Sequence, residues 1–360
     1  MVFALDFLAE GVWSRPKCAL ILQALSIRLC SIVFGNYRFY AMLTYVLFVL
    51  GFGLLIKGAD WLVVGASSIA KKYRVSDMVI GLTIVSLGTS MPELIVNILA
   101  SLDGSAELAV GNVFGSNIAN ILLILGIAAL IYPLPLRRST VVSEIPFSLM
   151  AALLVGFLAN AALFDQYQGL IISRTDGGIL LFFFVLFVLY IFKVAREGGE
   201  GEATENYEEK PLLQAGGLVA LGVASLFLGG KWTVDGATFI ATRLGMSESF
   251  IGLTVVAIGT SLPELVTSAV AASRRNTDIA VGNAVGSNIF NILWILGVSA
   301  MIHPLPFNVL SNFDILMIIF ASTLLILSVS LTRQRAVGRM SGVVFLLCYA
   351  AYVVFLLQRG

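Results

Sequence analysis

The chain has 360 residues, of which 59% are hydrophobic and 12% are charged, and its mean hydropathy is +0.97. This composition excludes a water-soluble globule and predicts an all-α polytopic membrane protein that lies in a lipid bilayer. The net charge of +1 is uninformative about partners. We expect no nucleic-acid partner, and no obligatory protein partner is evident in the sequence.

Ten apolar stretches are long enough to be transmembrane helices, since a spanning helix needs about 20 apolar residues. They lie at about residues 42–64, 78–101, 107–132, 143–164, 177–195, 212–235, 249–272, 279–302, 312–331 and 340–357. We predict four parts along the chain: an N-terminal extension at 1–41, a first five-helix repeat at 42–195, an acidic cytoplasmic linker at 196–211 and a second five-helix repeat at 212–360.

Residues 1–41 fit the pattern of spans poorly. Charged side chains interrupt an apolar run at 18–34 that is short for a span, and the order of charged and apolar residues does not fit a signal peptide. Met42 opens a clean span. We therefore hypothesise that translation starts at Met42 and that the preceding stretch is a mis-assigned start or a loose extension.

The cysteines and the single histidine indicate no metal chemistry. Cys18, Cys30 and Cys348 are odd in number and lie mostly in apolar sequence, so they predict neither a disulfide framework nor a metal site. His303 is interpreted as a helix-end residue near the membrane interface, in preference to a proton relay.

The second half of the chain repeats the first at a constant offset of 171 residues from Gly65 onward. Between 81–133 and 252–304, 28 of 53 positions are identical. Each predicted half has five spans, and an odd number makes the second copy enter the membrane from the opposite side. The sequence therefore predicts two inverted five-helix repeats.

The charges of the loops support this inversion. The short loop at Asp103 and Glu107 is acidic, whereas the equivalent loop in the second half holds Arg274 and Arg275. Basic residues mark the cytoplasmic face of a membrane protein. One face of the ten-span arrangement collects Lys71, Lys72, Arg74, Arg137, Arg138, Lys193, Arg196, Lys210, Arg274, Arg275, Arg333, Arg335 and Arg339, and the other collects Arg174, Arg243 and Arg359. We expect the first face to be cytoplasmic and the chain near Met42 to be external.

Residues 196–211, REGGEGEATENYEEKP, form the only long polar segment. The glycines, glutamates and lack of apolar periodicity predict a flexible cytoplasmic linker between the halves. Its six glutamates are a possible weak divalent-ion sensor. The linker interpretation is favoured, because the regular aspartate and glycine spacing of a calcium loop is missing.

The motif GTSMPE at 88–93 has a second copy, GTSLPE, at 259–264. Each copy places a glutamate, Glu93 or Glu264, near the middle of an apolar span. An acidic residue at that depth costs about 2.5–3.5 kcal/mol, so a functional role is the default interpretation. Two such residues at equivalent positions of a repeat predict one site.

The residues around Glu93 have the chemistry of a site for a hard cation. Thr89 and Ser90 lie four and three residues before it, so two hydroxyls and a carboxylate share a helical face. Pro92 cannot donate to the carbonyl of Gly88, and the helix should break or kink there. A freed carbonyl in hydrocarbon needs a partner such as an ion. Hydroxyl, carboxylate and carbonyl oxygens are the ligands that Ca²⁺ prefers, and no thiol or imidazole lies nearby for a softer metal.

The following helix carries GNVFGSNIAN at 111–120, repeated as GNAVGSNIFN at 282–291. Polar residues recur there every four residues, namely Asn112, Ser116, Asn120, Asn283, Ser287 and Asn291. We infer that these stripes face the carboxylate helices, either as ion ligands or as hydrogen-bonding residues between helices. The glycines that allow close approach are Gly111, Gly115, Gly282 and Gly286.

Charged residues elsewhere in the spans have a simpler interpretation. Lys57 and Asp60 are three residues apart, and Lys231 and Asp235 are four apart. We expect each pair to interact within its own helix or to reach the membrane interface.

The two copies of GTS[ML]PE, each followed by GN-x-x-GSNI-x-N, resemble the alpha repeats of the calcium/cation antiporter superfamily, in the branch of short bacterial sodium/calcium exchangers. The resemblance extends from Met42 to the end of the chain. It implies ten helices, with ions bound between helices 2, 3, 7 and 8 and access alternating by sliding of helices 1 and 6. Carried over by position, it implies ion ligands at Thr89, Ser90, Glu93, Ser116, Asn120, Thr260, Ser261, Glu264, Ser287 and Asn291, with the backbone carbonyls of Ser86 and Ala257.

This chain departs from the family at one position. The archaeal exchangers have an acidic residue at the position of Asn291, whereas this chain has an amide in both halves. With Glu93 and Glu264 as the central acids, the formal charge of the site is −2, which balances one Ca²⁺ or two Na⁺. The three-for-one stoichiometry of the family is therefore in doubt here.

We predict a secondary active antiporter of the bacterial plasma membrane that exchanges Na⁺ for Ca²⁺ by alternating access, with these ions as substrates and no cofactor. The nearest alternative is a Ca²⁺/H⁺ or K⁺-dependent Na⁺/Ca²⁺ antiporter, because a buried carboxylate can bind a proton in place of Na⁺. A cation channel could use the acids as a selectivity ring, but channels usually assemble such rings from several subunits. No enzyme is expected, since neither serine motif has a histidine partner.

Overall fold

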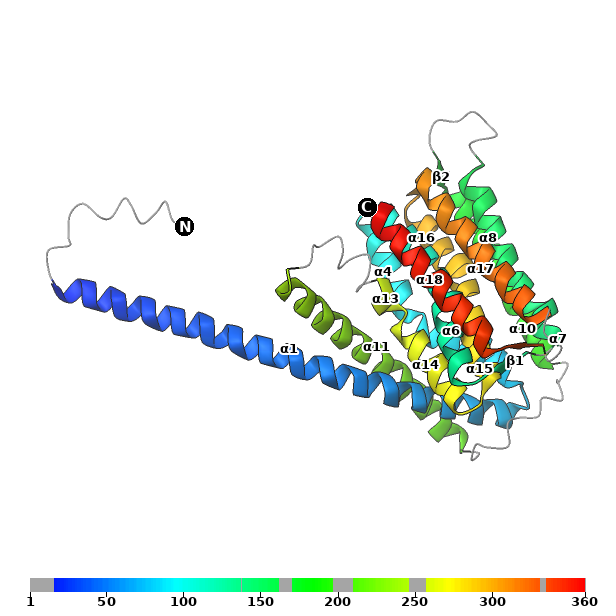
Figure 1. Ribbon diagram of the computed structural model, residues 1–360, viewed down its shortest axis with the longest axis horizontal. Coiled ribbons are helices and arrows are strands. Elements are labelled where there is room, and N and C mark those ends of the chain that lie inside the picture. The colour runs from blue at the N-terminus through cyan, green and yellow to red at the C-terminus, as the bar shows by residue number, and fades with distance from the viewer. Residues whose placement is uncertain are drawn as a thin grey trace.

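The computed structural model describes residues 16–136, 138–161, 170–196, 210–245, 257–330 and 335–359, which are mostly helical (Figure 1). The elements of the first half are α1 (Pro16–Tyr73), α2 (Asp77–Ile80), η2 (Gly81–Val85), α3 (Ser86–Thr89), α4 (Met91–Leu102), α5 (Ala106–Ala119), η3 (Asn120–Ile124), α6 (Leu125–Ile131), β1 (Leu134–Pro135), α7 (Arg138–Val142), α8 (Glu144–Ala159), β2 (Ile171–Ile172) and α10 (Arg174–Arg196). The elements of the second half are α11 (Leu212–Arg243), α13 (Ala257–Thr260), α14 (Leu262–Ser273), α15 (Thr277–Ile289), η5 (Phe290–Ile295), α16 (Leu296–Ile302), β3 (Leu305–Pro306), η6 (Val309–Ser311), α17 (Asn312–Ser330), β4 (Ala336–Val337) and α18 (Arg339–Arg359).

The described residues contain eight helices long and apolar enough to cross a membrane. The pair Asp77–Thr89 and Met91–Leu102, bent by 48°, makes a ninth if it is taken as one span. The predicted span 249–272 begins at residues outside the described ranges, and its remaining part forms α13 and α14. The prediction of an all-helical polytopic protein is confirmed.

The boundary predicted at Met42 is not marked in the fold. Helix α1 has 58 residues and passes through this position without a break. At 1.5 Å per residue it is roughly 90 Å long, about three times the thickness of the hydrocarbon core of a bilayer. The part that qualifies as a membrane span is Ala41–Tyr73, so the helix continues well beyond the span at its N-terminal side (Figure 1).

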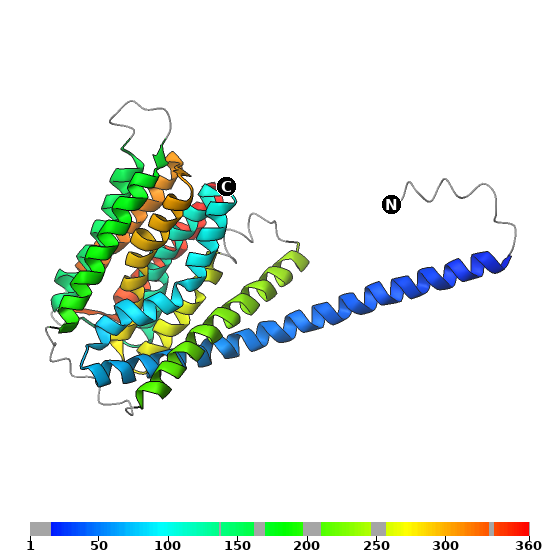
Figure 2. The same ribbon diagram turned by 180° about the vertical axis from the view of Figure 1, so that it is seen from behind.

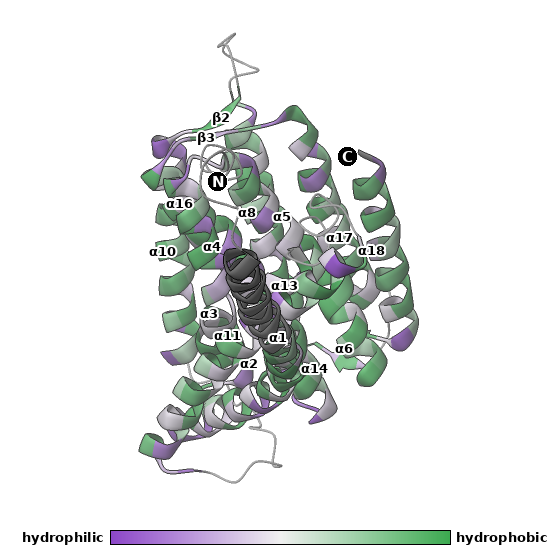
Figure 3. Ribbon diagram, turned by 90° about the vertical axis from the view of Figure 1, so that its left-hand side faces the viewer, coloured by the Kyte–Doolittle hydropathy of each residue, from purple (hydrophilic) through white to green (hydrophobic). Residues whose placement is uncertain are grey.

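The core of the bundle is formed by the helices that carry the asparagine stripes. In the most apolar 18-residue stretch of each span, 72% of Ala106–Ile131 and 78% of Thr277–Ile302 is buried inside the protein. The corresponding share is 17% for α10 and for α18. Figure 3 shows α10 and α18 at the outside of the bundle, apolar along most of their length and hydrophilic near their ends. The repeated polar motifs therefore lie in the protein interior, and α10 and α18 present apolar faces to lipid.

At each end of the bundle, a short strand of one half pairs with a short strand of the other half. Strand β1, which follows α6, pairs with β4, which precedes α18, and Leu134 lies opposite Val337. In the equivalent arrangement β3, which follows α16, pairs with β2, which precedes α10, and Leu305 lies opposite Ile172. In both pairs, the strand that follows one helix binds the strand that precedes the last helix of the other half, as expected for an inverted repeat.

Helices α1 and α11 lie side by side and touch through their backbones (Figures 1 and 2). Glycines recur every seven residues on both helices, at Gly51, Gly58, Gly65, Gly222, Gly229 and Gly236. A Cβ atom added at Gly58 would lie 2.9 Å from the carbonyl oxygen of Gly222, and one added at Gly222 would lie 2.7 Å from the nitrogen of Leu62. Only glycine allows this approach. We call these six residues the glycine seam.

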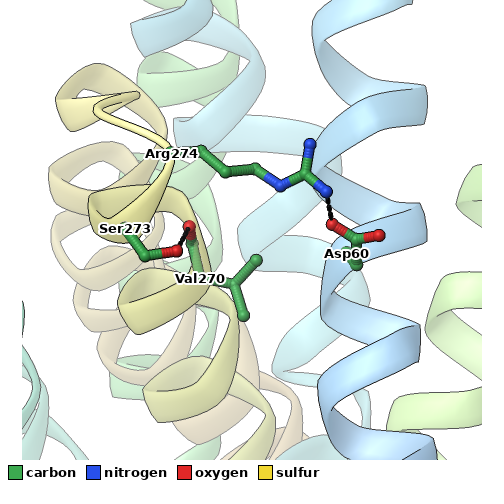
Figure 4. Close-up of polar contacts among 4 residues, drawn as sticks. All are labelled: Asp60, Val270, Ser273 and Arg274. Atoms are coloured by element: carbon green, nitrogen blue, oxygen red, sulfur yellow. Dashed lines mark hydrogen bonds and ion pairs between the residues drawn. The ribbon is translucent and has the colours of Figure 1, made fainter.

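The turn between α14 and α15 holds α1 through charged and polar side chains. Arg274 forms an ion pair with Asp60 of α1 (Figure 4). Asn276, two residues further on, donates to Ser67 Oγ of α1 (3.2 Å) and to Asp77 Oδ2 (2.9 Å). Asp60 therefore binds a residue of the other half, and the expectation that it pairs with Lys57 in its own helix is wrong. Sequence spacing could not reveal this contact, since the partners are 214 residues apart.

We expect Gly222→Ala to lower the melting temperature of the purified protein, because overpacking of a closely packed contact costs about 1–3 kcal/mol. The matched control is Gly216→Ala on the same helix, where nothing lies within 4 Å of an added Cβ atom. Alanine is also the better helix former there. Equal melting temperatures for the two variants, measured by thermal unfolding in detergent, would contradict the close approach of α1 and α11.

Candidate ion-binding site

The candidate site lies where two broken helices meet. The first break is at Ser90, between α3 and α4, and the second is at Ser261, between α13 and α14. Both serines leave helical geometry in the same way, with ψ angles of 8° and 6°. Pro92 and Pro263 occupy the first turn of the following helices, where a missing N–H group is tolerated. The predicted break at the GTSMPE motif is confirmed.

The two glutamates face the protein interior. Glu93 is 0% exposed and Glu264 is 1% exposed. Each lies in the first turn of its helix, α4 or α14, where the unpaired backbone N–H groups favour negative charge. Neither carboxylate is turned toward lipid.

Each carboxylate accepts a hydrogen bond from the motif serine of the other half. Ser90 Oγ donates to Glu264 Oε1 at 2.9 Å, and Ser261 Oγ donates to Glu93 Oε1 at 3.3 Å. Because Ser90 is one helical turn before Glu93, these contacts bring both acids to one place. The two GTS motifs are therefore in contact with each other, and their acids lie in the same part of the structure.

The next helix of each half completes the contacts of the serines. Ser90 Oγ lies 3.0 Å from Ser287 Oγ on α15, and Ser261 Oγ lies 3.1 Å from Ser116 Oγ on α5. Each carboxylate thus accepts a hydrogen bond from a serine whose hydroxyl also contacts a serine of the opposite half. The predicted residues Ser116 and Ser287 therefore lie next to the serines that bind the two glutamates.

The motif threonines are held by asparagines of the opposite half. Thr89 Oγ1 donates to Asn283 Oδ1 at 2.9 Å, and Thr260 Oγ1 donates to Asn112 Oδ1 at 3.2 Å. A hydroxyl that donates its single proton to an amide keeps its oxygen lone pairs free to accept or to coordinate. Asn283 is fixed in turn, because it donates to Ser268 Oγ at 3.0 Å.

Four buried oxygens of the site have no hydrogen-bond partner among the described residues: Glu93 Oε2, Glu264 Oε2, Asn120 Oδ1 and Asn291 Oδ1. A buried acceptor without a partner costs about 1–3 kcal/mol, and more when it is charged. The two carboxylates occupy equivalent positions of the repeat, as do the two amides. The amide oxygens lack a donor or an ion, and the carboxylates need a positive partner. This set is the strongest chemical feature of the site.

Asn120 and Asn291 lie in π-helical segments, which the sequence did not predict. Asn120 is the first residue of η3, and Asn291 is the second residue of η5. A π-helical turn changes the direction of its side chains relative to an α-helix and is frequent at functional sites. The amide of Asn120 also donates to Asn288 Oδ1 of the other half at 2.9 Å.

Further polar residues of the site were not singled out from the sequence. Asn97 accepts from Asn112 at 2.6 Å, as Ser268 does from Asn283, and Asn288 donates to the carbonyl of Asn117 at 3.3 Å. A signal was available, since the 171-residue offset aligns Asn97 with Ser268 and Asn117 with Asn288, so each position is polar in both halves.

The two predicted carbonyl positions differ in what can be described. The carbonyl of Ser86 accepts from the nitrogen of Ser90 (3.0 Å) and lies 3.3 Å from Thr89 Oγ1, whose proton is donated to Asn283. Ala257 is the first residue of α13, and its side chain lies outside the described part of the chain. Gly286 packs so closely that an added Cβ atom would lie 2.6 Å from Ser86 Oγ. The close helix approach predicted at Gly286 is therefore present in the structure.

Gly282 has the same packing role, since an added Cβ atom would lie 2.9 Å from the carbonyl of Met78. The equivalent neighbours of Gly111 and Gly115 fall at residues 249–257, whose side chains lie outside the described part of the chain. Within the described chain, no group of three or more histidine, cysteine, aspartate or glutamate residues could hold a metal ion. A cation at this site would therefore depend on neutral oxygens as well as on the two acids.

Two inverted copies of a broken helix, each with a buried acid, are the architecture of an ion transporter of the membrane. The chain matches the sodium/calcium exchanger protein family over residues 43–193 and 215–358, and it belongs to this family. The two matched segments correspond to the two halves of the fold. The protein is a transporter and not an enzyme.

Several relatives cover most of the chain. The putative antiporter CaxA of Alkalimonas amylolytica is 39% identical over 86% of this chain and 98% of its own length. The inner membrane protein YrbG of Escherichia coli is 41% identical over 73% of this chain and 81% of its own. The sodium/calcium exchanger MaX1 of Methanosarcina acetivorans is 34% identical over 87% and 98%.

The fold is similar to that of the sodium-calcium exchanger NCX_Mj. The structure of NCX_Mj soaked with Na⁺ and Ca²⁺ has a TM-score of 0.72 and 32% identity, and it covers 87% of this chain and 98% of that one. The structure soaked with Na⁺ and 10 mM Sr²⁺ has a TM-score of 0.73 and 33% identity, with coverage of 87% and 99%. The likeness thus extends to both sequence and fold.

Asn283→Ala should destabilise the protein by about 1–3 kcal/mol, because Thr89 and Ser268 lose a buried hydrogen-bond partner. The effect is measured as a lower melting temperature. Ser273→Ala is the control, since this exposed hydroxyl only donates to the carbonyl of Val270 in its own helix (2.7 Å, Figure 4). An Asn283→Ala variant as stable as the control would show that the threonine contact is not formed.

Proposed function

We propose that the protein is a secondary active antiporter that exchanges Na⁺ for Ca²⁺ by alternating access. The observation that carries this proposal is the pair of buried glutamates, each with one carboxylate oxygen that lacks a partner among the described residues. A buried negative charge needs a cation, and family membership supplies the class of transport.

The proposed ion ligands come from both halves. Five side-chain positions of the first half recur at the equivalent positions of the second half, and each half adds one backbone carbonyl. The set is Thr89, Ser90, Glu93, Ser116, Asn120, Thr260, Ser261, Glu264, Ser287 and Asn291, with the carbonyls of Ser86 and Ala257. Hydroxyl, amide, carbonyl and carboxylate oxygens suit Na⁺ and Ca²⁺ and would not hold a soft metal.

Competition for the two carboxylates would couple the ions. Glu93 and Glu264 can be neutralised by one Ca²⁺ or by two Na⁺, but not by both at once. An empty site carries two uncompensated charges, and moving it through the hydrocarbon layer is costly. The loaded forms would therefore cross and the empty form would not, which is the requirement for exchange.

Relatives support the choice of ions. MaX1 bears the name of a sodium/calcium exchanger, and NCX_Mj was soaked with Na⁺ and with Ca²⁺ or Sr²⁺. The Escherichia coli relative is named as an inner membrane protein. We propose that this chain likewise lies in a bacterial plasma (inner) membrane.

Turn geometry supports a cytoplasmic position for the basic face and for residues 196–211. Arg74 (φ 53°) and Arg275 (φ 60°) adopt left-handed backbone conformations on that face. Their equivalents at the 171-residue offset are Gly245 (φ 76°) and Gly104 (φ 72°) on the opposite face. Glycine adopts this conformation without strain, and arginine does not. A basic residue at a strained position on one face alone is the pattern that the positive-inside rule predicts.

Replacing either central acid should abolish exchange. We expect Glu93→Gln and Glu264→Gln to eliminate Na⁺-driven uptake of radiolabelled Ca²⁺ into proteoliposomes, because the amide keeps the shape of the side chain and removes its charge. Glu107→Gln is the matched control, since this glutamate is exposed at the start of α5. Undiminished uptake by either central variant would refute the site.

The charge of the site predicts how exchange responds to membrane potential. With two acids, two Na⁺ would exchange for one Ca²⁺ and no net charge would move. Uptake at clamped potentials should then be unchanged, whereas a three-for-one cycle would gain about 2.3 kcal/mol per 100 mV.

Separate Na⁺, K⁺ and H⁺ gradients in the same vesicles identify the partner ion. Uptake driven by a pH gradient, or requiring K⁺, would replace Na⁺/Ca²⁺ exchange by the corresponding antiport. Ca²⁺ entry without any counter-ion would indicate a channel.

A further inference from the structure

The ion pair between Asp60 and Arg274 has a counterpart of opposite sign in the repeat. At the 171-residue offset Asp60 aligns with Lys231, and Arg274 aligns with Asp103. Both members of the pair have changed sign, so the second pair is also attractive. A single unpaired charge change would have produced repulsion.

The first pair is formed in the structure. Asp60 lies on α1 and Arg274 ends α14 at the turn before α15, and their side chains point toward each other (Figure 4). The side chains are 25% and 37% exposed, so water still reaches them. The hydrogen bond from Asn276 to Ser67 holds the same turn to the same helix. This turn is therefore attached to α1 at two points.

The second pair is open. Lys231 on α11 and Asp103 at the end of α4 are exposed, and neither side chain forms an ion pair or hydrogen bond with another residue in the described ranges. Asp235, one helical turn after Lys231, is its nearest alternative partner along the helix. The two equivalent pairs thus have different states in one structure.

Helices α1 and α11 carry one member of each pair. The glycine seam joins these two helices backbone to backbone, so a movement of one requires a movement of the other. The remaining members, Arg274 and Asp103, lie on the turns that follow the two carboxylate helices. Each pair therefore has one member on the α1–α11 unit and one on the ion-binding core, and we place the two pairs at opposite faces of the membrane.

We propose that the two pairs are alternating latches of the transport cycle, which rests on the proposed alternating access. In an inverted repeat, the outward and inward states exchange the conformations of the two halves. The state shown has Asp60–Arg274 closed and Lys231–Asp103 open, so the opposite state has Lys231–Asp103 closed and Asp60–Arg274 open.

The reversal of sign has a physical reason. The turn on the cytoplasmic face is basic and the equivalent turn on the other face is acidic, in agreement with the positive-inside rule. The residue on the facing helix must then change sign as well to keep the attraction. Asp60 and Lys231 meet this requirement.

The test measures closure of the second pair by cross-linking. Lys231→Cys and Asp103→Cys are introduced together after Cys18, Cys30 and Cys348 are replaced by serine, and a short bifunctional thiol reagent is added to membranes. Arg274→Ala in this background should raise the cross-linked fraction by up to about fivefold, as expected for loss of an exposed ion pair. The matched control is Arg275→Ala, because Arg275 lies on the same turn but stacks over Tyr132 (5.7 Å).

A charge swap keeps the test decisive if Arg274→Ala folds poorly. Asp60→Arg together with Arg274→Asp should restore the original cross-linked fraction, and Asp60→Arg alone should raise it. An unchanged fraction in Arg274→Ala, or an equal rise in Arg275→Ala, overturns the latches. Cross-linking is measured without ion transport, so the two proposals can fail separately. If breaking the Asp60–Arg274 pair raises cross-linking but Na⁺ does not drive Ca²⁺ uptake, the latches are supported and the proposed ions are refuted. If Na⁺ drives Ca²⁺ uptake but cross-linking does not rise, the latches alone are refuted.

Discussion

Two carboxylates in the interior of a membrane protein impose the constraint on which the rest of the structure depends. Glu93 and Glu264 are removed from water, and each has only one oxygen hydrogen-bonded to a described residue. A charge in this environment is stable only beside another charge. The breaks at Ser90 and Ser261 and the hydroxyl pairs that these serines form place further oxygens beside the acids.

The site exists only because the halves interlock. Each glutamate is bound by a serine of the other half, and each motif threonine is bound by an asparagine of the other half. Strand exchange between β1 and β4 and between β2 and β3 fixes the same relation at the two ends of the bundle. The hydrogen bonds to the acids and the strand pairs at the ends of the bundle therefore follow from the same relation between the two inverted halves.

The helix break, the polar helix face and the duplication could be predicted from the sequence, because each depends on the spacing of residues along the chain. Pro92 indicated the helix break, the four-residue spacing of Asn112, Ser116 and Asn120 indicated one polar face, and the 171-residue offset indicated the duplication. Contacts between distant segments could not be predicted. Asp60 and Arg274 are 214 residues apart, and a π-helical turn at Asn120 has no sequence signal that distinguishes it from an α-helix. The proposal of Na⁺ and Ca²⁺ as the transported ions rests on membership in the family and on its named relatives, not on any single spacing.

The strand exchange has a consequence for the origin of the chain. A polypeptide that contained one half alone would lack the partner strand for each of its own strands and the serine that binds its own acid. Two identical copies, inserted in the membrane in opposite orientations, would supply both. Fusion of two such genes would free each copy to acquire its own loop charges, with arginine retained at the turns of one side and glycine at those of the other.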